Sequence, residues 1–259
     1  MSRPIKLLKF QTVAKSAAVW KSVISAITTV TDGGQFQAGP GGIRFSGKDH
    51  SHETFIDVDI PNEAFQQYHC PSLLQFGIRL SELSQIMKRA DNNAPIEISI
   101  HHTSLIVDTG SCHYELNLPE SSALISRLSG QNFDTKLLIR RKTFADILHD
   151  VRVFSDRVSL RTILLPEIVT SFSSTTDRGS AIVTIAGDTF APDVPHQTSR
   201  TKKSEATYSL GLVSNLLDSI CWNNDYIQLE YSSGSTLMLK FLLENSVGLR
   251  IYVAPQIAM

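Results

Sequence analysis

The sequence predicts an α+β protein made of two similar halves. Four segments share the apolar spacing i, i+3, i+4, i+7, which places four side chains on one face of a helix. The segments between them read as short strands, and their short connections make them mostly antiparallel. The same order of elements occurs twice within 259 residues, which indicates a duplication with two helices packed on antiparallel sheets in each half.

The four predicted helices are defined by their apolar stripes. The first and third stripes begin 124 residues apart, and the second and fourth begin 130 residues apart. Near-equal offsets support the duplication. The stripes are Trp20, Val23, Ile24 and Ile27; Leu83, Ile86, Met87 and Ala90; Phe144, Ile147, Leu148 and Val151; and Val213, Leu216, Leu217 and Ile220.

Strands are predicted between the helices. Asp57 and Asp59 alternate with apolar residues, so we expect both carboxylates on the solvent side of their strand. The first half has predicted strands at 5–11, 35–38, 41–46, 55–60, 73–79, 96–100, 105–108 and 112–117. The second half has them at 136–139, 158–164, 168–172, 181–185, 207–210, 226–231, 237–242 and 249–253.

Two polar segments interrupt this pattern. Residues 119–134 are rich in Ser and are predicted to connect an N-terminal domain, 1–118, to a C-terminal domain, 135–259. Residues 187–204 contain two prolines and three basic residues without any period, so they are predicted to form a long surface loop.

Composition excludes several classes of protein. Hydrophobic residues make up 42% of the chain and charged residues 19%, unlike a disordered or collagen-like chain. The net charge of −1 argues against a nucleic-acid binder held by a dominant basic surface. No apolar run is long enough for a membrane span or a signal peptide. Three widely spaced cysteines suit a reducing, intracellular compartment better than a disulfide framework.

Catalytic signatures are scarce, and we predict no enzyme, metal or cofactor. The glycine pairs precede no helix, and no nucleophile elbow or Cys-x-x-Cys motif occurs. Residues 49–53 read Asp-His-Ser-His-Glu, which could supply two metal ligands to an enzyme. A polar loop leading into the next strand is the preferred interpretation, because no third or fourth ligand is evident.

Positive charge is concentrated on the predicted helices. The helices and their flanks carry eight basic and four acidic residues, a net charge of +4, which leaves −5 for the rest of the chain. This distribution has two interpretations, solvated helix faces or a helical surface that meets a phosphate backbone without reading bases. The basic residues are Lys15, Lys21, Lys88, Arg89, Arg140, Arg141, Lys142 and Arg152.

Four motifs resemble the DNA sliding clamp of archaea and eukaryotes, the proliferating cell nuclear antigen family. They are Trp20-Lys21 with Ile24-Ser25-Ala26-Ile27, Gly42-Ile43-Arg44-Phe45 leading to Asp49-His50-Ser51-His52, Phe65 to Tyr68-His69-Cys70, and Tyr252-Val253-Ala254-Pro255-Gln256-Ile257. They occur in the family's order and cover essentially the whole chain.

The resemblance implies a processivity factor with the DNA-clamp fold, a trimeric ring that encircles duplex DNA with helices inside and sheets outside. Lys21, Lys88 and Arg152 would then face phosphates, with Lys15, Arg89 and Arg140 to Lys142 as further candidates. Such contacts are blind to sequence and sensitive to salt, which permits sliding. Subunits would join by strand pairing through Ser111, Cys112, Tyr114 and Leu116 on one edge and Ala181, Val183 and Ile185 on the other.

The resemblance also implies a pocket beneath the connector that takes a short peptide motif. DNA polymerase, flap nuclease, DNA ligase and a clamp loader would be the partners, at the cytoplasm or nucleoid in an archaeon or in the nucleus of a eukaryote. The matching positions are His52, Phe55, Leu124, Ile125, Leu128, Thr236, Tyr252, Ala254 and Pro255.

Several positions depart from the family pattern. Lys48 and Glu53 stand where the pocket is usually apolar, which suggests different partners or a checkpoint-type clamp that recruits damage-signalling proteins. Asp146, Asp150 and Asp218 lie on the third and fourth helices, where basic residues are common. A subunit with this little positive charge points to a heterotrimer in which other subunits supply the charge, with a homotrimer as the alternative.

Overall fold

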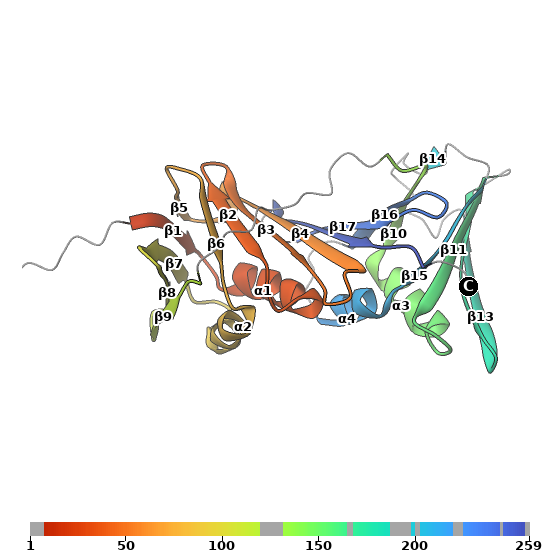
Figure 1. The fold of residues 1–259 in the computed structure, drawn as a ribbon, viewed down its shortest axis with the longest axis horizontal. Helices are drawn as coiled ribbons and strands as arrows, with labels where there is room; N and C mark the ends of the chain where they lie inside the picture. The colour runs from red at the N-terminus through yellow and green to blue at the C-terminus, as the bar shows by residue number, and fades with distance from the viewer. Residues whose placement is uncertain are drawn as a thin grey trace, which may run out of the picture. The chain divides into compact units, whose positions relative to one another are not determined.

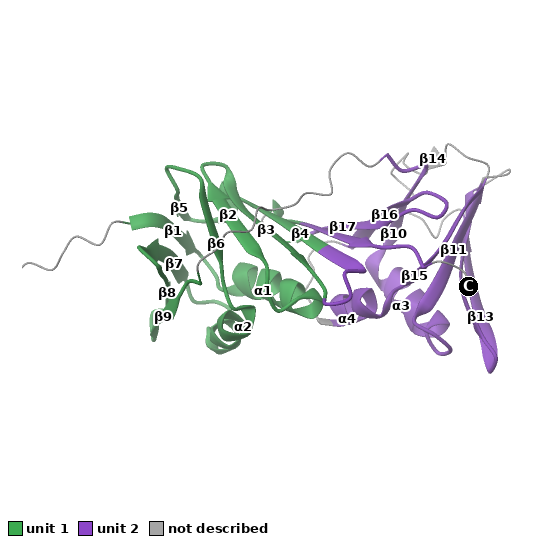
Figure 2. Cartoon of the chain, in the orientation of Figure 1, with its two compact units in different colours: residues 1–49, 56–127, 243–248 green, residues 50–55, 128–242, 249–259 purple. Residues whose placement is uncertain are grey.

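A computed structural model describes residues 8–119, 132–164, 168–186, 198–199, 203–219, 225–243 and 246–256. The chain forms two compact units (Figure 2). Unit 1 comprises residues 1–49, 56–127 and 243–248, and unit 2 comprises residues 50–55, 128–242 and 249–259. Each unit contains two of the four α-helices of the described residues, together with antiparallel strands, so the predicted α+β class is confirmed.

Unit 1 contains two antiparallel groups of strands. The first has the order β5-β1-β7-β8-β9 and the second the order β4-β3-β2-β6. The strands are β1 (Leu8–Ala14), β2 (Gln35–Gly39), β3 (Gly42–Lys48), β4 (Thr54–Pro61), β5 (Gln67–His69), β6 (Leu74–Gly77), β7 (Ile96–His101), β8 (Ser104–Asp108) and β9 (His113–Asn117). The helices are α1 (Ala18–Val30) and α2 (Leu80–Arg89), and a short 3-10 turn, η1 (Asn62–Ala64), follows β4.

Unit 2 repeats this plan. Its strand orders are β14-β10-β16-β17-β18 and β13-β12-β11-β15. The strands are β10 (Thr135–Arg140), β11 (Arg157–Leu164), β12 (Ile168–Thr176), β13 (Gly179–Ala186), β14 (Thr198–Ser199), β15 (Lys203–Ser209), β16 (Tyr226–Tyr231), β17 (Leu237–Leu242) and β18 (Gly248–Val253). The helices are α3 (Arg141–Val151) and α4 (Gly211–Ser219).

The apolar stripes of the helices form the core of each unit. Every predicted stripe residue within the described part of the chain is buried, and Ile220 lies outside that part. Helix α1 packs against α2 and β3, and α3 packs against α4, β10, β12 and β13 (Figure 1). The stripes therefore leave the polar side of each helix facing away from the strands.

The turn between β2 and β3 explains two of the motifs. Gly42 has a φ of 132°, and a Cβ atom there would lie 2.2 Å from the Ile60 carbonyl oxygen, so only glycine fits. The Tyr68 hydroxyl lies 2.6 Å from the carbonyl oxygen of Gly39 and 2.8 Å from that of Gly42. Burial raises the pKa of Tyr68, which keeps this hydroxyl protonated as a donor.

Unit 2 contains a chain of buried hydroxyl groups. The Tyr231 hydroxyl lies 2.6 Å from Thr162 Oγ1, which lies 2.9 Å from Thr170 Oγ1. All three residues are buried, so these contacts satisfy groups that would otherwise be costly to bury. The chain joins β16 to β11 and β12.

Several strand predictions need correction. Strand β1 spans Leu8–Ala14, beyond the predicted end at residue 11. Strands β5 and β14 were not predicted; both are short and pair with β1 and β10 respectively. Part of the predicted 187–204 loop forms β14 and the start of β15, and the remainder lies outside the described residues.

The expectation for Asp57 was wrong. Its side chain is only 6% exposed, and it accepts a hydrogen bond from Ser46 Oγ at 3.1 Å. Asp59 is partly exposed, as expected, and its carboxylate lies 2.8 Å from Arg44 Nε. Alternation along β4 fails at Asp57 because a hydrogen-bonding partner is available inside the unit.

We predict that Tyr231 makes the protein less stable in alkali. Burial raises its pKa from 10 to about 12, so the folded state holds the phenolic proton more tightly than the unfolded state does. This contribution to stability is complete below pH 10 and is lost as the pH rises towards 12. Tyr231→Phe should cost about 1 kcal/mol at neutral pH, through the lost hydrogen bond. Urea unfolding should show that the free energy of unfolding falls less between pH 9 and pH 11 for the variant than for the wild type. Equal decreases for the two proteins would contradict the assignment.

Candidate functional site

Strands β9 and β13 form open edges of their sheets. Each has a strand neighbour on one side only within the described part of the chain. An open edge presents unpaired backbone N–H and C=O groups that can hydrogen bond with a strand of another chain. Both strands overlap the segments that the sequence predicts as subunit edges, 111–116 and 181–186.

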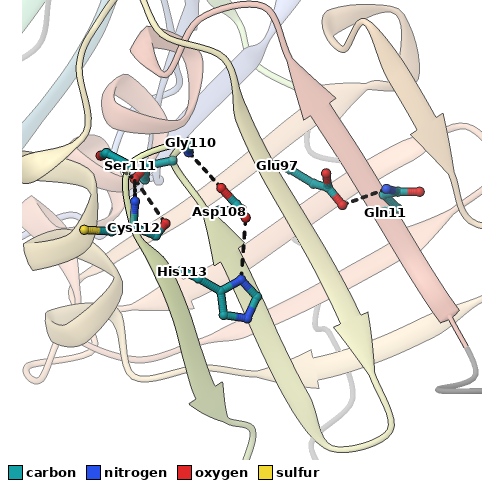
Figure 3. Close-up of polar contacts among 8 residues, drawn as sticks. Gln11, Glu97, Asp108, Gly110, Ser111, Cys112 and His113 are labelled. Atoms are coloured by element: carbon teal, nitrogen blue, oxygen red, sulfur yellow. Dashed lines mark hydrogen bonds and ion pairs between the residues drawn. The ribbon is translucent and has the colours of Figure 1, made fainter. Parts of the chain in front are cut away.

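A hydrogen-bonded turn holds the start of β9 in place (Figure 3). Within this turn the Thr109 N–H donates to the Cys112 carbonyl oxygen at 3.0 Å, and the Gly110 N–H donates to Asp108 Oδ1 at 2.7 Å. Asp108 Oδ2 also lies 3.5 Å from His113 Nδ1. Ser111 and Cys112 belong to this turn, whereas the predicted edge residues Tyr114 and Leu116 lie on β9 itself.

Side chains on the two edges differ in exposure. On β9, Tyr114 and Leu116 are half-buried, and a hydrogen bond with the Cys112 side chain raises the pKa of Tyr114. On β13, Ala181 and Val183 are half-buried, whereas Ile185 is buried in unit 2. Ile182 is 68% exposed, and the sequence prediction did not select it. Ile182 shares one face of β13 with the polar residues Ser180 and Thr184, and an apolar residue on a polar face was the sequence signal for this position.

The C-terminal segment brings together several residues of the predicted peptide pocket, all in unit 2. The rings of Phe55 and Tyr252 pack with centroids 5.9 Å apart. The Ala254 N–H donates to the Glu53 carbonyl oxygen at 2.7 Å, which joins the segment to the residues preceding β4. His52 has a φ of 60°, the left-handed conformation of a tight turn.

The same segment also lies along β15. The Gln256 N–H donates to the Thr207 carbonyl oxygen at 2.7 Å, and Pro255 forms an isolated antiparallel bridge with Tyr208. The Tyr208 hydroxyl donates to the Ser235 carbonyl oxygen at 2.8 Å, next to Thr236. Burial raises the pKa of Tyr208 and so keeps this donor protonated. Predicted pocket residues Leu124, Ile125 and Leu128 lie outside the described residues.

The basic residues of unit 1 lie on or beside its helices. Lys21 on α1 donates to Asn92 Oδ1 at 2.6 Å, while Lys88 and Arg89 are exposed in the last turn of α2. Positive charge at this end of a helix is stabilised by the helix dipole. Lys15 lines a hollow of about 510 Å³ together with Ser16, Val19, Glu63, Ala64, Phe65 and Gln66.

The basic residues of unit 2 have different surroundings. Arg140 and Lys142 are exposed at the start of α3, whereas Arg141 is half-buried and its Nε atom has no hydrogen-bond partner. Arg152 Nε lies 2.6 Å from Asp156 Oδ1, so this guanidinium is neutralised locally. His149 Nε2 on α3 lies 3.3 Å from Asp218 Oδ1 on α4.

The described residues contain no group of three or more His, Cys, Asp or Glu side chains placed to hold a metal ion. Cys70 is buried and Cys112 exposed, and both are free thiols. Helices in the described ranges are too short or too polar to cross a bilayer.

Comparison with known proteins gives consistent matches. The family described as "Proliferating cell nuclear antigen, N-terminal domain" matches residues 9–108. The DNA polymerase sliding clamp of Nitrosopumilus maritimus is 33% identical over 239 residues, which cover 92% of this chain and 94% of the relative. That of Cenarchaeum symbiosum is also 33% identical, over 240 residues with the same coverage.

A solved structure matches the fold over nearly the whole chain. A. fulgidus PCNA, bound to the C-terminal region of FEN-1, superposes with a TM-score of 0.84 at 16% identity. The match covers 96% of this chain and 99% of that chain.

Proposed function

The chain belongs to the proliferating cell nuclear antigen family of DNA polymerase sliding clamps, and on this premise we propose that three clamp subunits close into a ring around duplex DNA. The ring tethers replication and repair enzymes to the template. A ring that encloses DNA needs no strong local contact with it. A net charge of −1 is therefore compatible with a DNA-binding role for the chain. The role requires binding surfaces and no catalytic group.

The open edges β9 and β13 carry this proposal. They belong to different units and differ in side chains, so a contact between β9 of one subunit and β13 of the next is heterologous. A heterologous contact repeated by a rotation that closes generates a ring. We assign the exposed Ile182 to this contact, because pairing would remove its side chain from water.

The C-terminal segment supports the proposed peptide site. Phe55 is half-buried and its ring packs on that of the buried Tyr252, and Ala254 and Pro255 continue from this pair along unit 2. Aromatic and aliphatic anchors in such a site favour a short peptide with apolar side chains. The A. fulgidus relative is bound to the C-terminal region of FEN-1, and we expect polymerase, ligase and clamp-loader motifs to compete for the same site.

The ring proposal is tested by mass and by DNA topology. Light scattering should give three times the mass of the chain, alone or after mixing with other clamp subunits from the same cell. Clamps loaded onto nicked circular DNA should stay bound in high salt and escape when the circle is cut. A chain that remains monomeric under every condition, or that leaves circular and linear DNA equally fast, would contradict the proposal.

We predict that ring assembly protects Cys112 from alkylation. This thiol is exposed beside the open edge of β9, whereas Cys70 is buried. In a Cys221→Ser background, iodoacetamide should label Cys112 readily at low protein concentration and more slowly once rings form. Cys70 provides the internal control, because its labelling should remain slow throughout. Equal rates for Cys112 above and below the assembly concentration would place the subunit contact elsewhere.

We predict that Tyr252→Ala combined with Leu128→Ala abolishes polymerase stimulation. Tyr252→Ala removes the partner of the Phe55 ring and costs roughly 3 kcal/mol of stability, so ring mass and retention on circular DNA must be measured alongside. Two variants are matched controls. Tyr252→Phe keeps the aromatic side chain at this position, and Leu242→Ala removes an exposed aliphatic side chain elsewhere in unit 2. Full stimulation by an intact double-variant ring would show that the peptide site has been misplaced.

A further inference from the structure

We propose that the helix pair of unit 2 is an electrostatically weak sector of the DNA-facing surface, in which Asp146, Asp150 and Asp218 oppose the phosphates. This inference rests on the proposed ring, with its helices towards DNA. It assigns these three carboxylates a role that tunes how tightly DNA is held, and it leaves most of the attraction to unit 1.

The two helix pairs differ in charge. Helices α1 and α2 carry three basic and one acidic side chain, and α3 and α4 carry two basic and three acidic side chains. The acidic residue of α2, Glu82, lies 3.5 Å from Arg79, which neutralises it. Lys21 is hydrogen bonded to a neutral amide, so its charge is retained. Across the described part of unit 1, neither Lys88 nor Arg89 forms an ion pair with a carboxylate.

The carboxylates of unit 2 share one exposed face. Asp146 and Asp150 are one helical turn apart on α3, opposite the buried stripe of that helix, and both are exposed. The contact between His149 and Asp218 brings the exposed faces of α3 and α4 together. The three carboxylates therefore belong to one surface, and a phosphate near it meets negative charge.

The nearby cations offset this surface only in part. Arg152 is held by Asp156, which lies 2.6 Å from its Nε atom. Lys142 lies one helical turn before Asp146 on the exposed side of α3, so it offsets the first of the three carboxylates, while Asp150 and Asp218 lie beyond its reach along the helices. The exposed side of this helix pair is therefore basic at the start of α3, at Arg140 and Lys142. It is acidic along the rest of α3 and on α4. Lys15 in unit 1 is not counted as a phosphate contact, because the carboxylate of Glu63 lines the same hollow.

The test is a triple variant, D146N/D150N/D218N, loaded onto linear DNA with free ends. We expect a longer residence time than that of the wild type, and a plot of log residence time against log salt that steepens by up to about 0.9 for each phosphate newly contacted. The three side chains are exposed, so we expect the ring to form normally. Arg152→Ala should leave the salt slope unchanged, whereas Lys21→Ala with Lys88→Ala should flatten it.

A charge-matched variant, D59N/D177N/E205Q, removes three solvent-accessible carboxylates from β4, from the turn between β12 and β13 and from β15, away from the four helices. It should behave as the wild type, which separates a local effect from a change in net charge. Equal residence times for the two triple variants, or a loss of slope in Arg152→Ala as large as in the lysine variant, would overturn the inference alone. A wild-type ring that is not retained on nicked circular DNA would overturn the proposed function and this inference with it.

Discussion

Burial of one apolar stripe on each of four helices is the interaction on which the rest of the structure depends. A stripe of four residues fixes both the position of a helix and its rotation about its own axis. Because Trp20 and Phe144 point into the cores of their units, the helix geometry directs Lys21 and Lys142 away from those cores. The polar helix faces that carry the proposed DNA contact are therefore a geometric consequence of packing, and their charges can change without disturbing the core.

The sheet edges are the second consequence of this packing. Sheets built on helix pairs end in strands with unpaired backbone groups, which must be covered or used. The edge at β15 is partly covered, because Gln256 hydrogen bonds to Thr207, whereas β13 has no second neighbour among the described residues. The same segment that covers β15 also presents Tyr252 beside Phe55. One stretch of chain thus serves both the sheet and the proposed peptide site.

The sequence determines the helices and most strands because their periodicities report burial directly. Strands β5 and β14 escaped prediction because they are two or three residues long and exist only through pairing with β1 and β10. Asp57 escaped because alternation cannot reveal an interior partner such as Ser46.

Site residues were predictable only in part, for the same kind of reason. The motif at residues 252–255 gave the C-terminal segment, since its residues are contiguous and its resemblance is specific. Which strand residues face outward depends on register, so Ile185 was chosen where Ile182 is the exposed side chain. Whether a basic residue is available depends on its neighbours, and the pair between Arg152 and Asp156 becomes evident only in three dimensions.

Uneven charge is compatible with a clamp because enclosure and attraction do different work. A ring that is closed around DNA cannot dissociate sideways. Each additional phosphate contact therefore raises the energy barrier to sliding more than it improves retention on DNA. Fields from exposed charges decay within about 8 Å at physiological salt, so only side chains that approach the duplex contribute. In the proposed ring, a sector containing Asp146, Asp150 and Asp218 would lower the number of simultaneous contacts and make successive positions along the duplex similar in energy. On this proposal the near-neutral composition suits movement along DNA, and Lys21, Lys88 and Arg89 would supply the attraction that centres the duplex.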